Sequence, residues 1–194
     1  MVDPENGIIG NPNPDWTANF DNKIRWRGFT LKFLINIKKG GQIWNGTKNT
    51  LDYYGMSKNS GGLRNIYNYV FDGVDINGNE NTIAVDFANP ANPIEENRWV
   101  RYGKHGVAED AIEDASWIRL SELSLNYDFS NNLIRKLKIN KIGITFFAKN
   151  LFLFTNYSSI DPDTYLPGTT NGAGLDYFNL PNTRSYGMAL KILL

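Results

Sequence analysis

Five stretches of this chain alternate between apolar and polar residues, and this alternation limits the possible folds more than any other feature of the sequence. In the last stretch every second residue from Tyr186 to Leu194 is apolar, and Ser185, Gly187, Ala189 and Lys191 fall on the other face. Because successive side chains of a strand point to opposite faces, one face meets an apolar medium and the other a wetter one. The predicted strands span roughly residues 19–26, 29–38, 117–129, 141–153 and 184–194.

The first two predicted strands are separated only by Arg27 and Gly28. A two-residue hairpin turn places the residues on either side of it, Trp26 and Phe29, opposite each other. Both residues belong to the apolar faces of their strands, so the turn and the alternation predict the same register.

The connections between the strands alternate between short and long. Residues 39–115 and 155–182 form two long segments rich in Gly, Pro and Asn, within which we expect a short helix around residues 63–69. Short turns on one side and long loops on the other are typical of an outer-membrane barrel. We therefore expect an all-β fold: an antiparallel meander of about five transmembrane strands of an outer-membrane β-barrel, with long extracellular loops.

The composition excludes several classes of function. The 20 basic and 20 acidic residues balance, which gives no indication of a nucleic-acid partner, and no run approaches the roughly 20 apolar residues of a membrane helix. Cysteine is absent, and His105 is the only histidine, with no nucleophile or acid near it in the sequence. We therefore expect no enzyme, no cofactor and no metal centre.

Several motifs occur in order along nearly the whole chain. They are Gly10-Asn11-Pro12-Asn13-Pro14-Asp15-Trp16, Ala115-Ser116-Trp117-Ile118-Arg119-Leu120, Leu123-Ser124-Leu125-Asn126-Tyr127, Lys149-Asn150-Leu151-Phe152, Asp161-Pro162-Asp163 and Pro181-Asn182-Thr183-Arg184-Ser185-Tyr186-Gly187. Together they resemble the C-terminal part of the SusC/RagA family of TonB-linked outer-membrane proteins, the TonB-dependent receptors. The chain departs from the family pattern at Leu194, since most members end in Phe.

This resemblance implies a role in active nutrient import across the outer membrane. In the family, a large barrel surrounds a plug, a surface lipoprotein of the SusD type captures a glycan or peptide substrate, and the TonB complex supplies energy. The resemblance implies that residues 1–194 are an incomplete C-terminal segment of this large barrel. They would supply barrel wall in contact with outer-membrane lipid, lumen lining and extracellular loops. We expect the remainder of the barrel and the plug to be partners, and we do not expect transport by this segment alone.

Aromatic residues in the predicted loops are the candidate ligand contacts. Their flat faces suit sugars and peptides, and loops often carry function, although such rings also pack against neighbouring loops or a partner lid. The candidates are Trp44, Trp99, Tyr102, Tyr165 and Tyr177. Basic residues on the predicted lumen face could attract an anionic ligand, or could simply line a hydrated wall. They are Lys23, Arg25, Lys32, Lys38, Lys149 and Lys191.

Two acidic segments have competing interpretations. Residues 72–80 place oxygen ligands at alternate positions, as a calcium loop does, but lack the full spacing, and Asn77-Gly78 favours a hairpin turn. Asp161 and Asp163 flank Pro162, which favours a turn over a metal site.

The main alternative for the whole chain is a soluble β-sandwich that binds carbohydrate through loop aromatics. A sandwich requires a second layer that covers the apolar face of the sheet, and the long loops contain few apolar residues for such a layer. The exposure of the apolar face therefore distinguishes the two folds.

Overall fold

The structure is a computed structural model that describes residues 7–75, 77–86, 107–129, 139–164 and 173–193. The chain divides into two compact units. The loop unit comprises residues 1–12, 42–113 and 165–179, and the sheet unit comprises residues 13–41, 114–164 and 180–194.

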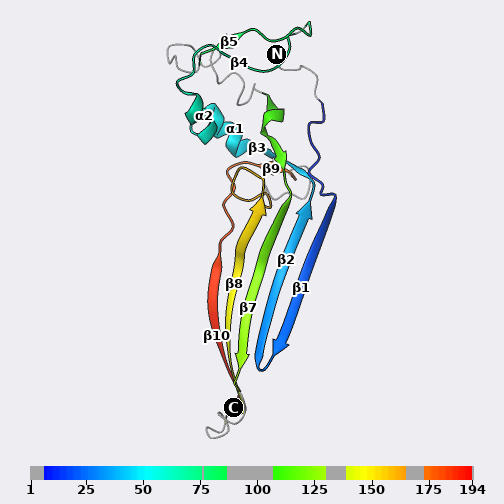
Figure 1. The fold of residues 1–194 in the computed structure, drawn as a ribbon, viewed down its shortest axis with the longest axis vertical. Helices are drawn as coiled ribbons and strands as arrows, with labels where there is room; N and C mark the ends of the chain where they lie inside the picture. The colour runs from blue at the N-terminus through cyan, green and yellow to red at the C-terminus, as the bar shows by residue number, and fades with distance from the viewer. Residues whose placement is uncertain (1–6, 76, 87–106, 130–138, 165–172, 194) are drawn as a thin grey trace. The chain divides into compact units, whose positions relative to one another are not determined.

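The sheet unit is built on five long antiparallel strands, which Figure 1 shows side by side. They are β1 (Trp16–Trp26), β2 (Phe29–Lys39), β7 (Trp117–Asp128), β8 (Lys141–Thr155) and β10 (Ser185–Leu193), in the order β1-β2-β7-β8-β10. The predicted all-β class and antiparallel five-strand meander are confirmed. The first strand begins at Trp16, three residues earlier than expected, and Leu194 lies outside the described residues.

The two-residue turn has the geometry that its sequence predicts. Arg27 and Gly28 have φ angles of 45° and 88°, and Trp26 pairs with Phe29. Two successive positive φ angles match the right-handed twist of a hairpin. A side chain at position 28 would also approach the Asp128 carbonyl oxygen to 2.9 Å, so glycine is required there for two reasons.

A bulge in β7 keeps the apolar residues on one face of the sheet. On the neighbouring strand β2, Ile35 pairs with Leu120 and the adjacent Leu34 pairs with Glu122, so Ser121 on β7 has no opposite residue in this ladder. The extra residue changes which sequence positions face the apolar side, from even numbers up to Leu120 to odd numbers from Leu123. The sequence analysis did not predict this bulge.

The apolar face of the sheet is uncovered. One row of directly paired residues crosses all five strands and contains only apolar side chains: Ile24, Leu31, Leu125, Phe146 and Met188. Ile24 and Phe146 are each 56% exposed and Met188 is 67% exposed. A β-sandwich would bury this row, so the exposed face argues against the soluble alternative.

The loop unit contains short elements. Its strands are β3 (Gln42–Asn45), β4 (Tyr69–Val70), β5 (Ala84–Val85), β6 (Ile112–Asp114) and β9 (Leu175–Asp176), and its helices are α1 (Gly46–Tyr53), α2 (Lys58–Leu63) and η3 (Ala108–Ala111). The prediction of a helix around residues 63–69 was wrong, because α2 ends at Leu63 and β4 begins at Tyr69. None of the described helices is long and apolar enough to cross a membrane.

Polar side chains form much of the interior of the loop unit. Asn45 is fully buried; its Oδ1 accepts from the Lys48 backbone N–H at 2.9 Å and thereby begins α1, and its Nδ2 donates to Glu113 at 3.3 Å. Glu113 also accepts from Lys48 Nζ at 3.0 Å. A polar interior of this kind depends on specific partners rather than on a hydrophobic pattern.

Candidate functional site

Of the five candidate aromatics, the structure brings two together in the loop unit. The rings of Trp44, on β3, and Tyr177, just after β9, are nearly parallel, with an angle of 6° and centroids 6.4 Å apart. Gly46 lies so close that a side chain there would meet both rings, at 2.2 Å and 2.7 Å. Trp99, Tyr102 and Tyr165 lie outside the described residues.

A largely apolar cavity of about 410 Å³ adjoins Trp44. Its walls include Pro12 and Gln42 beside Trp44, and Gly174 and Leu175 at the start of β9. The Trp44 indole Nε1 is buried and has no hydrogen-bond acceptor within the described part of the chain. A buried donor without an acceptor costs about 1–3 kcal/mol.

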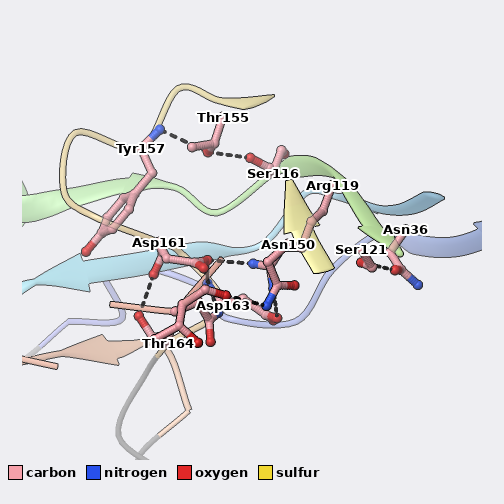
Figure 2. A network of polar contacts seen from close by, with 12 residues as sticks. Asn36, Ser116, Arg119, Ser121, Asn150, Thr155, Tyr157, Asp161, Asp163 and Thr164 are labelled. Carbon is pink, nitrogen blue, oxygen red and sulfur yellow. Dashed lines mark hydrogen bonds and ion pairs between the residues drawn. The ribbon is translucent and has the colours of Figure 1, made fainter. Parts of the chain in front are cut away.

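A buried ion-pair network holds the segment after β8 against the polar face of the sheet unit (Figure 2). Arg119 on β7 donates through Nη2 to Asp161 Oδ1 at 2.7 Å and contacts Asp163 Oδ2 through Nη1 at 3.3 Å. Asn182, just before β10, donates to the other Asp161 oxygen at 2.7 Å. Arg119 and Asp161 are 8% and 5% exposed, so both charges are withdrawn from water and satisfy each other.

Asp161 also forms the turn that its sequence predicts. Its Oδ1 accepts from the Asp163 backbone N–H at 3.0 Å, and its carbonyl oxygen accepts from the Thr164 hydroxyl at 2.9 Å. The sequence analysis predicted the turn but missed the ion pair to Arg119, which lies 42 residues earlier. In a regular strand Arg119 would fall on the apolar face with Leu123 and Leu125, and this misplaced charge is the signal that the sequence offers.

A basic cluster occupies the other end of the same polar face, near the Arg27-Gly28 turn. A hollow of about 280 Å³ is lined there by cations from four strands and by one carboxylate, Asp128. The cations, which define the basic cluster, are Lys23, Arg25, Lys32, Lys141 and Lys191. Lys141 pairs with Asp128 at 3.0 Å. Within the described part of the chain, no carboxylate lies within 4.0 Å of the other four.

Residues 72–80 form a hairpin turn, as Asn77-Gly78 predicts. The Gly78 N–H donates to the Asp75 carbonyl oxygen at 3.1 Å, and Val74 and Glu80 form an antiparallel bridge. Hydrogen bonds from Asn79, followed by those from Asn77, hold the pKa of Asp75 below its usual range. Among the described residues no group of three or more acidic, His or Cys side chains is arranged to hold a metal ion.

Comparison with curated proteins finds TonB-dependent receptors. The chain is 27% identical over 190 residues to TonB-dependent receptor P3 of Formosa agariphila, and 26% identical over 190 residues to TonB-dependent receptor P39 of the same organism. Each match covers 95% of this chain and 17% of the relative, so the chain spans about a sixth of the length of these proteins. No protein-family model matches the chain.

Comparison with solved structures finds the same fold in a peptide transporter. The chain superimposes on the RagAB peptide transporter with a TM-score of 0.62 at 18% identity, over 92% of this chain and 17% of that one. The RagAB importer in its open-open state gives a TM-score of 0.57 at 19% identity, over 94% of this chain and 17% of that one. These relatives and neighbours are receptors and transporters rather than enzymes.

Proposed function

We propose that this chain, a SusC/RagA-like TonB-dependent receptor sequence, supplies barrel wall and outer loops to an importer of the outer membrane. In this proposal the remainder of the barrel and a plug complete the pore, a SusD-type surface lipoprotein delivers a glycan or peptide, and the TonB complex supplies energy. The observation that carries the proposal is the five-stranded sheet with one exposed apolar face and one polar face, in a chain related to TonB-dependent receptors.

The two faces suit a wall between lipid and water. The apolar row through Phe146 would contact lipid chains, and the opposite face, which carries Arg119 and the basic cluster, would face an aqueous lumen. Such a wall buries its apolar residues in the bilayer, so it needs no second protein layer. The proposal therefore accounts for side chains that a soluble protein would cover.

The cavity beside Trp44 is the proposed substrate contact in the described loops. The apolar walls beside Trp44 could pack against a sugar ring or against an apolar side chain of a peptide. Tyr177 would act indirectly, since it stacks on Trp44 and fixes the orientation of the indole. Trp99, Tyr102 and Tyr165 stay candidates for the same role.

The orientation of the sheet can be tested with single cysteines, because these 194 residues contain none. Met188→Cys lies on the apolar face, and the neighbouring Ala189→Cys lies on the polar face. In the complete polypeptide, reconstituted in lipid vesicles, we expect a fluorophore attached in the Met188→Cys variant to be quenched by nitroxide-labelled lipid. We expect the thiol of the Ala189→Cys variant to react with a membrane-impermeant maleimide instead.

The neighbouring positions serve as matched controls for each other, since they share one edge strand and differ only in the face they occupy. Equal quenching at both positions would contradict the proposed wall, and so would aqueous labelling at both. Uptake of fluorescent peptides and oligosaccharides by cells, with and without the gene, would then identify the substrate class.

A further inference from the structure

The basic cluster brings together like charges that the described part of the chain does not neutralise. Lys23 on β1 and Lys32 on β2 stand directly opposite each other in the register. Like charges at directly opposed positions of an antiparallel pair destabilise it. Arg25, the next residue on the same face of β1, adds a third positive charge to the same hollow. A ligand of opposite charge would relieve the repulsion among these three side chains.

The carboxylates on the same face do not supply enough negative charge. Among the described residues, Asp128 is the only carboxylate that lines the hollow, and Lys141 already pairs with it. Asp21 precedes Lys23 by two residues on β1, but it has no cation within 4.0 Å in the described part of the chain. Five cations against one carboxylate leave an excess of four positive charges at the hollow.

Neutral hydrogen-bonding groups complete the hollow. Thr30, Ser124, Asn126 and Thr145 line it between the cations. The Thr145 hydroxyl already donates to Asn126 Oδ1 at 2.8 Å, whereas hydroxyls such as those of Thr30 and Ser124 can donate to a carboxylate oxygen. Hydrogen bonds to charged groups are stronger than those between neutral groups. The surface therefore offers both long-range attraction and short-range donors to an anion.

The spread of the cations indicates how large the anion must be. They extend from β1 to β10, and four inter-strand gaps of about 4.8 Å separate these strands by roughly 19 Å. One small anion cannot contact cations at both edges of such a surface. A flexible ligand that carries several carboxylates can contact them at once and gain from each contact.

We propose that the basic cluster is a binding site for substrates that carry several carboxylate groups, and that it favours anionic substrates in their passage along the lumen. This inference rests on the proposed import function and names the substrate class. The ligand chemistry is a set of carboxylates on a short chain, which an acidic peptide or an acidic oligosaccharide could provide.

The test uses the complete polypeptide in detergent and two fluorescent probes, hexaglutamate and hexagalacturonate, with hexalysine as the opposite charge. We expect at least one acidic probe to bind, binding to weaken as salt rises, and hexalysine not to bind. In the triple variant Lys23→Gln/Arg25→Gln/Lys32→Gln we expect binding to weaken by about threefold or more, since each exposed charge contributes a small amount.

Lys149→Gln is the matched control. Lys149 is a cation on the same face, but it lies 3.8 Å from Glu122, so its charge is already offset and its loss should leave binding nearly unchanged. Binding of hexaglutamate alone would support the proposal with an acidic peptide as ligand, and binding of hexagalacturonate alone would support it with an acidic sugar.

Two outcomes would overturn the inference: neither acidic probe binds, or the triple variant binds as the unaltered protein does. The first outcome would mean that carboxylates elsewhere in the polypeptide occupy the cluster. The cysteine labelling pattern tests the wall separately, so a normal pattern without anion binding would refute this inference and leave the proposed import function standing.

Discussion

The two ends of the polar face both carry charge, but they differ in how the charge is balanced. At one end Arg119 is buried and contacts Asp161 and Asp163, which the same chain supplies. At the other end Lys23 and Lys32 oppose each other without a carboxylate between them. A buried charge must be paired for the fold to be stable, whereas an exposed charge is solvated by water and can remain unpaired until a ligand binds. The first end is therefore structural, and the second is suited to binding.

The largest expected effect is the loss of Arg119. Arg119→Met removes the cation and leaves Asp161 buried and unpaired, which should lower the free energy of unfolding by about 3–5 kcal/mol. Denaturant unfolding in detergent measures this change. Arg119→Lys should recover only part of it, because lysine cannot contact both Asp161 and Asp163 with a planar fork.

Lys149→Met provides the comparison for Arg119. The Lys149 and Glu122 side chains are 56% and 59% exposed, so this change should cost less than about 1 kcal/mol. Similar losses for Arg119→Met and Lys149→Met would break the distinction between the buried and the exposed charges.

A smaller effect is expected at the turn that sets the basic cluster in register. Gly28→Val places a branched side chain at a φ of 88° and close to the Asp128 carbonyl oxygen, which should cost about 2 kcal/mol. The pairing of Lys23 with Lys32 depends on this turn, so acidic probes should also bind more weakly. Arg27→Asn is the control, since asparagine tolerates positive φ, and it should leave unfolding nearly unchanged.

A charge reversal would test the sign of the repulsion. Lys23→Glu places a carboxylate opposite Lys32 and should raise the free energy of unfolding by about 0.2–1 kcal/mol while it weakens the binding of acidic probes. Lys149→Glu creates the reverse case, since it places two carboxylates opposite each other with Glu122, and it should lower stability. Changes of the same sign in both variants would show that charge does not govern this face.

The smallest expected effect is a loss of stability at low pH, which arises near the Arg119 end of the polar face. The Ser116 hydroxyl donates to Asp114 and, as the largest contribution, holds the pKa of this carboxyl below its usual range. A depressed pKa adds stability above the ordinary pKa of the unfolded chain, and this stability is lost as the pH falls through the folded value. Melting temperatures between about pH 5 and pH 3 should therefore fall less in Asp114→Asn than in the unaltered protein.

The sheet could be predicted from the sequence because its signals are local. Alternation assigns each residue to a face, and two residues between Trp26 and Phe29 fix a register. The network at Arg119 could not be predicted in this way, since Asp161 lies 42 residues away and no period links the two positions. The bulge is visible in the sequence, because the apolar positions change from even numbers at Leu120 to odd numbers at Leu123. The predicted regular strand did not take this change into account.

The candidate aromatics show the limit of composition as a guide. Tyr177 lies in a loop as predicted, whereas Trp44 lies on the short strand β3, and the sequence did not indicate that these residues, 133 positions apart, would stack. The interior of the loop unit has the same character: Asn45 and Glu113 meet through specific hydrogen bonds, which leave no periodic pattern. Such contacts form only when segments that are distant in the sequence come together in the folded chain.

Ser121, the extra residue of the bulge, changes which sequence positions of β7 face the polar side of the sheet. With this one extra residue, Arg119 and Glu122 both face the polar side, although a regular strand would send an odd-numbered and an even-numbered position to opposite sides. If Ser121 were deleted, Leu120 would adjoin Glu122, and the two halves of β7 would alternate as one regular strand, with Arg119 and Glu122 still on the polar side. A one-residue deletion at the bulge should therefore preserve both faces of the strand, whereas the same deletion at a paired position such as Ser124 would turn one part of β7 to the wrong face.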